Sequence, residues 1–296
     1  MPSQNTSPQI LNLDAWVDSA ASDPVRHRQR QVTHVLLHAV ARTPVLRDAL
    51  CLKGGILMSA AYNSIRQTGD VDFSASANPE PFTSALRETL DAALTSAAAD
   101  LGYVDLRLKV QRFEKNPRPA TFEEATSPAI KMTIGIALRA TNAAKSLERG
   151  QAIEVLGVDI SFKEPIINVQ VLNIQDQEHS VFAYSIEDLI AEKLRALVQQ
   201  KMRNRRRRQD IYDIFWLTQN VSIDADARKS ILSSFLKKSD ARELVTTQDS
   251  FDDPETRERA GADWHTMALE IGDLPDFNTT YDSVRDFYRS LPWDEK

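Results

Sequence analysis

The stretch at residues 52–74, LKGGILMSAAYNSIRQTGDVDFS, constrains the fold more than any other part of the chain. It opens with a glycine pair, Gly54 and Gly55, whose lack of side chains lets the backbone turn sharply and approach a ligand closely. Apolar residues then recur at helical spacing over residues 56–65, which predicts a helix that starts just after the glycines. The N-terminus of such a helix favours anions, and phosphates above all.

The same stretch ends in a D-x-D pattern formed by Asp70 and Asp72. Polar and apolar residues alternate here, which predicts a strand with both carboxylates on one face and with Val71 and Phe73 facing the core. Neighbouring carboxylates repel each other unless a cation lies between them. Alone, a D-x-D pattern is commonly two solvated charges, and a Gly-Gly pair is commonly a turn. Their combination across one helix length favours a Mg²⁺ site beside a phosphate-binding loop.

The composition is that of a globular protein with one large domain or two small ones. Of the 296 residues, 42% are hydrophobic and 26% are charged. The single cysteine, Cys51, excludes an internal disulfide framework and fits a reducing compartment. No apolar run approaches the roughly 20 residues that cross a membrane, and the N-terminal residues lack the features of a signal peptide. We therefore expect a cytoplasmic protein that makes no membrane contact.

Charge is distributed unevenly along the chain, whose net charge is −6. Residues 221–296 carry 17 acidic and 10 basic side chains, a balance of −7, which leaves +1 for residues 1–220. The acidic part would repel a nucleic acid, so we expect any polyanion to bind within residues 1–220.

Periodicity divides the chain into helical and strand-forming parts. Residues 11–50 and 83–101 have helical spacing, whereas residues 104–110, 130–138 and 153–162 alternate as strands do. We predict a helical N-terminal segment at residues 1–50, a core at residues 51–175 and a helical C-terminal lobe at residues 176–296.

The alternating segment at residues 153–162 carries a candidate third carboxylate, Asp159. Val158, Ile160 and Phe162 share one face of the expected strand, so Asp159 lies on the other face. Alone, it would be an edge-strand charge. Beside Asp70 and Asp72 it is a candidate metal ligand, because three carboxylates hold two metal ions at a triphosphate better than two carboxylates do.

A further helix is predicted to begin after Ser185, whose side chain can cap it, with Asp188 three residues later. Lys193 falls on the apolar face of this helix. A lysine on a buried face is unfavourable unless it is paired or binds a ligand, although its long stem can also carry the ammonium group to water.

A basic run, KMRNRRRR, occupies residues 201–208. Its last four residues are Arg205, Arg206, Arg207 and Arg208. The run could bind RNA phosphates without sequence preference, bind an acidic partner, or remain a solvated loop. It leads into a helical segment in which Asp210 and Asp213 share one face, and Asp210 suits the positive N-terminal end of that helix.

Taken in order, these motifs resemble those of the AbiEii/AbiGii family of nucleotidyltransferase-like toxins, to which the mycobacterial MenT toxins are similar. The resemblance covers residues 50–220. Its motifs are K-G-G-x-L at 53–57, R-x-T-x-D-x-D-F-S at 66–74, A-E-K-L-R-A at 191–196 and Q-D-I-Y-D-I at 209–214. Fourteen residues separate Gly55 from Asp70, as in the family. Gln209 departs from the pattern, since arginine is common at that position, but Arg208 is adjacent.

The resemblance implies an α/β (α+β) fold with a polymerase-β-like nucleotidyltransferase core, a mixed sheet and a helical C-terminal lobe. It implies that Asp70 and Asp72, joined by Asp159, hold Mg²⁺, and that Gly54 and Gly55 hold the triphosphate of an NTP.

Further residue roles follow from the same resemblance. Lys193 is implied to contact the nucleotide phosphates, and an aspartate of the last motif is implied to be needed for transfer. We favour Asp210 without separating it from Asp213. Arg66 and Asp213 are additional candidates for nucleotide binding.

The implied reaction is attack by a hydroxyl group on the α-phosphate of the NTP, with release of pyrophosphate. In MenT-like relatives the acceptor is the 3′ end of tRNA, whose modification blocks translation, and an AbiEi-like antitoxin is the implied partner. Two alternatives stay open: transfer to a small molecule, and a non-catalytic nucleotide-binding module that acts through a partner.

Overall fold

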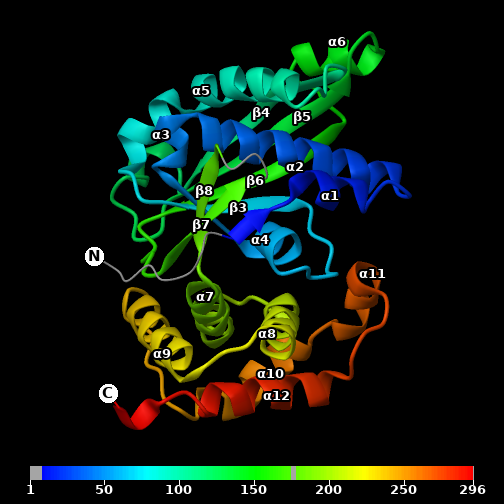
Figure 1. The fold of residues 1–296 in the computed structure, drawn as a ribbon. Coiled ribbons are helices and arrows are strands. Elements are labelled where there is room, and N and C mark those ends of the chain that lie inside the picture. Colours follow the sequence, from blue (N-terminus) through cyan, green and yellow to red (C-terminus); the bar gives the residue numbers. More distant parts are fainter. Residues whose placement is uncertain (1–8, 175–177, 296) are drawn as a thin grey trace. The chain divides into compact units, whose positions relative to one another are not determined.

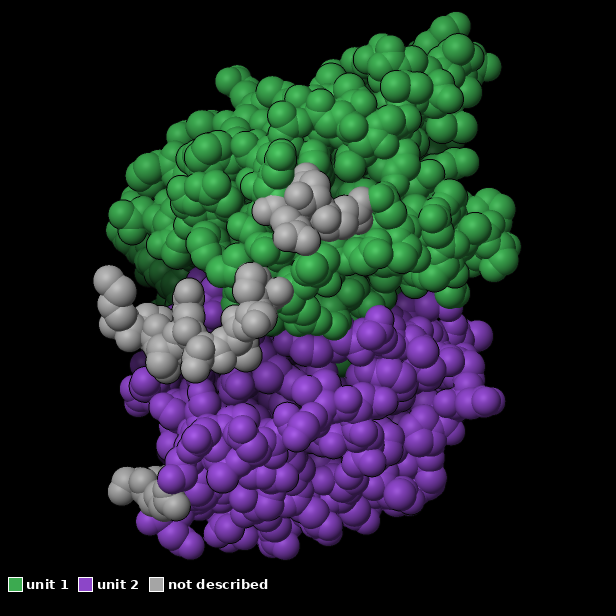
Figure 2. Space-filling model, in the orientation of Figure 1, with its two compact units in different colours: residues 1–61, 68–164, 170–183 green, residues 62–67, 165–169, 184–296 purple. Residues whose placement is uncertain are grey.

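The computed structural model describes residues 9–174 and 178–295, so the predicted boundary between residues 175 and 176 lies outside the described residues. The chain divides into two compact units (Figure 2). Unit 1 contains residues 1–61, 68–164 and 170–183, and unit 2 contains residues 62–67, 165–169 and 184–296. The predicted N-terminal segment thus belongs to unit 1, and two short pieces of the predicted core are counted with unit 2.

Unit 1 is built on a mixed sheet in which the described residues form eight strands, in the order β1-β7-β8-β2-β3-β6-β5-β4 (Figure 1). The strands are β1 (Gln9–Leu11), β2 (Leu50–Lys53), β3 (Asp70–Ala75), β4 (Leu106–Asn116), β5 (Ala129–Leu138), β6 (Glu154–Phe162), β7 (Val169–Ile174) and β8 (Ser180–Tyr184). Strand β3 pairs in parallel with β6 and antiparallel with β2, and β5 pairs antiparallel with both β6 and β4. The expected mixed sheet is confirmed.

The helices of unit 1 include two long ones that pack against each other, α2 and α5. They are α1 (Leu13–Asp18), α2 (Pro24–Arg42), α3 (Pro44–Arg47), α4 (Gly54–Ala61), α5 (Pro79–Asp100) and α6 (Asn142–Glu148). The start of α2 follows from its sequence: Asp23 accepts hydrogen bonds from the first backbone amides, and Pro24 has the φ angle that a first helical residue needs.

The structure corrects the prediction for residues 56–65. Helix α4 includes both glycines and ends at Ala61, four residues earlier than expected. Asn63 has a φ angle of +54°, which a right-handed helix cannot accommodate, and Ile65 is 53% exposed rather than part of an apolar helix face. The chain then passes through residues 62–67, which belong to unit 2, before it returns to unit 1 at β3.

Strand β4 is also longer than predicted. It continues past residue 110 to Asn116, through an irregularity between Val110 and Arg112, and stays paired with β5. The residues after the irregularity are mostly polar, so alternation alone did not reveal that they pair.

Unit 2 is helical apart from short connecting segments. Its helices are α7 (Ile186–Gln199), α8 (Arg208–Asn220), α9 (Ala225–Asp240), α10 (Pro254–Gly261), α11 (Ala268–Ile271) and α12 (Phe277–Arg289). Ser185 accepts a hydrogen bond from the amide of Asp188 and so caps α7 as the sequence predicts. Part of the core is an aromatic cluster in which Tyr288 contacts Phe235, Phe251 and Trp293. None of the helices in the described part of the chain has the length and apolarity that a membrane crossing requires.

Candidate active site

Three carboxylates of unit 1 share one face of the sheet, where β3 runs beside β6. The register places Asp72 opposite Asp159 and Asp70 opposite Gly157. Neighbouring strands lie about 4.8 Å apart, so Asp72 and Asp159 project side by side, and Asp70 follows two residues away on the same face. Together they offer the oxygen ligands that Mg²⁺ prefers.

Glycines at two positions leave room for these carboxylates. A Cβ atom on Gly54 would lie 2.9 Å from Cγ of Asp72, and one on Gly157 would lie 2.9 Å from Cγ of Asp70, closer than real Cβ contacts allow. Within residues 9–174 and 178–295, no three His, Cys, Asp or Glu side chains form a ready group for a metal ion. An ion at Asp70, Asp72 or Asp159 would therefore need further ligands, and Mg²⁺ at nucleotide sites takes one or two carboxylates together with phosphate oxygens.

The glycine pair forms the first turn of α4, and its neighbours require glycine at both positions. Gly54 has a φ angle of +72°, which side chains disfavour. A Cβ atom on Gly55 would lie 2.7 Å from Oγ1 of Thr68, just before β3. The structure thus brings the glycine pair and the D-x-D pattern into contact.

Lys53, just before the glycine pair, lies beside this site and was not singled out by sequence reasoning. It pairs with Asp72 in the register of β2 and β3. Its ammonium group bonds to the carboxylate of Glu164 and lies 3.3 Å from Oγ of Ser161. Ser74 donates a hydrogen bond of 2.9 Å to the same carboxylate. The signal in the sequence was the lysine of the K-G-G motif, to which the prediction gave no role.

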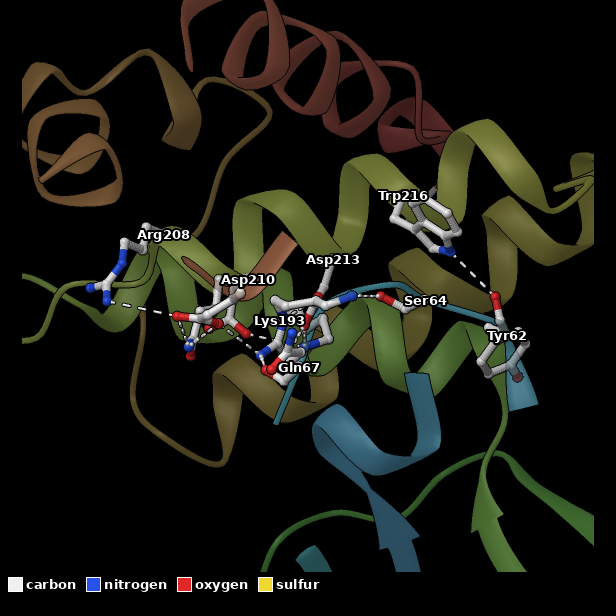
Figure 3. A network of polar contacts seen from close by, with 11 residues as sticks. Tyr62, Ser64, Gln67, Lys193, Arg208, Asp210, Asp213 and Trp216 are labelled. Carbon is white, nitrogen blue, oxygen red and sulfur yellow. Dashed lines mark hydrogen bonds and ion pairs between the residues drawn. The ribbon is translucent and has the colours of Figure 1, made fainter. Parts of the chain in front are cut away.

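In unit 2, a buried polar network surrounds Lys193 of α7 (Figure 3). Its ammonium nitrogen lies 2.6 Å from Oδ2 of Asp213 and 3.2 Å from Oδ1 of Asp210, both on α8. Arg66 approaches Asp213 through two hydrogen bonds of 2.8 Å, from Nε to Oδ1 and from Nη2 to Oδ2. The lysine on the apolar helix face is therefore paired, and its ammonium group does not extend to water.

The pKa values of this network reflect opposing effects. Burial alone lowers the pKa of Lys193, but the charges of Asp213 and Asp210 outweigh it, and the pKa is raised. Burial alone raises the pKa of Asp213, but the charges of Lys193 and Arg66 outweigh it, and the pKa is lowered. Lysine and aspartate are therefore both charged at neutral pH.

Exposure separates the two aspartates that the sequence leaves equivalent. The Asp213 side chain is 0% exposed, and both its oxygens accept hydrogen bonds from Arg66 and Lys193. The Asp210 side chain is 13% exposed, and its second oxygen forms an ion pair of 3.6 Å with Arg207. Asp210 is therefore the more accessible of the two aspartates, and Asp213 could contact a nucleotide only if the network opened.

The four arginines of the basic run differ in their surroundings. Arg206 pairs with Asp263, Arg207 with Asp210 at 3.6 Å, and Arg208 with Glu270 at 4.0 Å. Arg205 is exposed and makes no side-chain hydrogen bond or ion pair with the residues that the structure describes, and the same is true of Arg203. The charge open to a polyanion is therefore smaller than the sequence suggests.

Comparisons with known proteins show the family and the fold of the chain. The family model for the AbiEii nucleotidyl transferase toxin of type IV toxin–antitoxin systems matches residues 35–288. A search of curated proteins found no match. Among solved structures, MenT4, a nucleotidyltransferase toxin of Mycobacterium tuberculosis, is similar with a TM-score of 0.59 and 15% identity over 96% of this chain and 92% of that chain.

A second similar structure is that of JHP933 from Helicobacter pylori, with a TM-score of 0.51 and 12% identity over 91% of this chain and 92% of that chain. At these identities the solved structures establish a shared fold. The family match covers most of the chain and includes every motif described above. The chain belongs to the AbiEii nucleotidyltransferase toxin family of type IV toxin–antitoxin systems.

Proposed function

We propose that this toxin transfers a nucleoside monophosphate from an NTP to the 3′ end of tRNA, and that it thereby inhibits translation and growth in the cytoplasm. The observation that carries the proposal is the contact between the glycine pair at the start of α4 and the D-x-D carboxylates of β3. A phosphate-binding helix end and metal-binding carboxylates are the two elements that transfer from a triphosphate requires.

Asp70, Asp72 and Asp159 would hold Mg²⁺, together with phosphate oxygens of the NTP. The ion, when bound, would neutralise charge on the triphosphate and favour departure of pyrophosphate. The amides at the start of α4, after Gly54 and Gly55, would donate hydrogen bonds to the phosphates. Most of the rate enhancement would come from positioning and charge neutralisation, because phosphoryl chemistry needs little else from a protein.

We propose Lys193 and Asp210 of unit 2 as further catalytic residues. Lys193 carries a positive charge suited to a nucleotide phosphate, and Asp210 is the more accessible of its two carboxylate partners. We assign the role of the transfer-essential aspartate to Asp210 on this ground.

The tRNA would contact the basic run at residues 201–208. Arg205 and Arg203 are the arginines whose charge the described residues leave uncompensated, so they are the first candidates for phosphate contacts. Membership of a type IV toxin–antitoxin family implies an antitoxin partner, which we propose to be AbiEi-like.

A second candidate function is transfer to a small-molecule acceptor. It is favoured by the internal ion pairs of Arg206, Arg207 and Arg208, which reduce the basic surface that RNA binding needs. A small acceptor needs only a pocket, so loss of Arg203 and Arg205 would leave such an activity intact.

The test is incubation of the purified protein with total tRNA, Mg²⁺ and each α-labelled NTP in turn, beside Asp72→Ala. Label on tRNA from one nucleotide, lost in the variant, would establish the activity, the base and the acceptor class. Label on neither tRNA nor small molecules, combined with growth arrest that Asp72→Ala leaves unchanged, would sink the enzymatic proposal in favour of a non-catalytic binding module.

A further inference from the structure

The carboxylate of Asp213 is closed to a ligand, because the side chain is 0% exposed and both of its oxygens accept hydrogen bonds. It is fully buried and receives three hydrogen bonds, two from the guanidinium group of Arg66 and one from Lys193. Two parallel hydrogen bonds fix both the distance and the relative orientation of the guanidinium and carboxylate groups, which a single hydrogen bond does not.

The segment that carries Arg66 is itself held in place within unit 2. Trp216 donates from Nε1 to the carbonyl of Tyr62 at 3.2 Å, and the amide of Gln67 donates to the carbonyl of Glu270 at 3.1 Å. Figure 3 shows the Trp216–Tyr62 contact and the cluster of Lys193, Asp210 and Asp213. Both ends of residues 62–67 are thus anchored, and the guanidinium group of Arg66 is fixed between them.

The side chain of Lys193 is the one in this network that most needs to be held in place. Its ammonium group sits on a four-carbon stem and adopts many orientations when nothing restrains it. The charged groups that face Lys193 are Asp213 and Asp210 from α8 and Arg66 from residues 62–67. Arg66 and Asp213 are more buried than Asp210 and are joined to each other by two hydrogen bonds.

We propose that Arg66 and Asp213 form a positioning pair that holds the ammonium group of Lys193 in place, and that neither residue touches the nucleotide. The contact of Lys193 with nucleotide phosphates rests on the proposed function. The positioning of its ammonium group by Arg66 and Asp213 does not. The pair therefore acts on transfer through Lys193 alone.

The first test measures the chemical reactivity of Lys193 and needs no substrate. The folded protein is treated briefly with an amine-acylating reagent, and modification of Lys193 is measured by mass spectrometry. We expect Asp213→Asn to raise the modification rate of Lys193 about tenfold or more, the change that one unit of lysine pKa produces. A rate equal to that of the wild type would overturn the proposal.

The chain offers a matched control for loss of a buried aspartate. Asp188 of α7 is also 0% exposed and pairs at 3.2 Å with a buried lysine, Lys238. Asp188→Asn should leave the reactivity of Lys193 unchanged. If it raised that reactivity as much as Asp213→Asn does, general loosening of unit 2 would explain the result and the specific pair would be refuted. Should Asp213→Asn fail to fold, Arg66→Lys, which keeps the charge but loses the forked geometry, takes its place.

The second test is a double-mutant cycle in the tRNA-labelling assay. Lys193→Met should lower kcat/KM about 100-fold or more, and Asp213→Asn about 10- to 100-fold. The double variant should be no slower than Lys193→Met alone, because Asp213 acts only through the lysine. Multiplied losses would show a separate nucleotide contact by Asp213 and would overturn the proposal.

The two tests separate failure of the positioning pair from failure of the proposed function. If the wild-type protein transferred no nucleotide to any acceptor, the proposed function would fail, and the acylation rates would still decide the positioning pair.

Discussion

Gly54 lies directly against the carboxylate of Asp72, and a Cβ atom on the glycine would collide with Oδ2 and lie 2.9 Å from Cγ. The glycine proposed to leave the start of α4 open to a phosphate thus also lies against a carboxylate proposed to bind metal. A side chain at residue 54 would disturb both at once.

We therefore expect Gly54→Ala to abolish transfer, with a matched control at Gly102. Gly102 has a φ angle of +74°, close to the +72° of Gly54, but nothing lies within 4 Å of its Cβ position. Both substitutions carry the backbone strain of a positive φ angle, about 1 kcal/mol. Only Gly54→Ala displaces Asp72, so kcat should fall by orders of magnitude there and stay near the wild-type value for Gly102→Ala. Equal activities would refute the proposed role of this contact.

Lys53 should matter to stability more than its place in a short motif suggests. The side chains of Lys53 and Glu164 are 11% and 12% exposed, so Lys53→Met removes a lysine that pairs with a nearly buried carboxylate. We expect a loss of roughly 3 kcal/mol in the free energy of unfolding. Lys131, which is 57% exposed and lies 3.8 Å from Asp159, is the control, and Lys131→Met should cost less than about 1 kcal/mol. Urea unfolding curves would check both values. Similar losses for the two variants would contradict the expected contribution of the Lys53–Glu164 pair to stability.

Asp213 should make the protein sensitive to acid. Its pKa is lowered in the folded state from an ordinary value of 3.8, so its contribution to stability is present above that value and is lost as pH falls through the folded-state pKa. Asp213→Asn should be less stable than the wild type at neutral pH by about 3–5 kcal/mol. The difference should shrink as pH falls below about 4. Urea midpoints measured from pH 7 to pH 2.5 test this, and a difference independent of pH would show that Asp213 is not charged in the native state.

The parts of the fold that follow from nearby residues were predictable from the sequence. Asp70 and Asp72 share a face because strand geometry alternates, Ser185 caps α7, and the alternation of residues 130–138 identifies β5. The mixed sheet follows from these strands and the family motifs.

The parts that depend on distant residues were not predictable. Lys53 and Glu164 are 111 residues apart, and Arg66 and Asp213 are 147 apart, so no local period reveals either pair. The early end of α4 has the same origin, because residues 62–67 are fixed by contacts to α8 and to Glu270 and not by their own helical pattern. Likewise, Asp210 and Asp213 differ in accessibility because Arg66, far away in the sequence, bonds to Asp213.

The basic run gives the last prediction, which concerns the acceptor. Removing a charge that contacts a phosphate weakens RNA binding for all sequences and lowers the slope of log K against log salt by about 1. Arg203→Ala and Arg205→Ala should each do so, because the described residues leave these two charges uncompensated. Arg206→Ala should change the slope less, since that arginine already pairs with Asp263. Binding of tRNA to each variant, measured from 50 to about 200 mM salt, would show whether the slopes change in this order.

If none of the three substitutions changed the slope while transfer to tRNA persisted, the RNA would have to bind elsewhere within residues 1–220. If tRNA did not bind at all, the small-molecule acceptor would become the better explanation of the same catalytic residues.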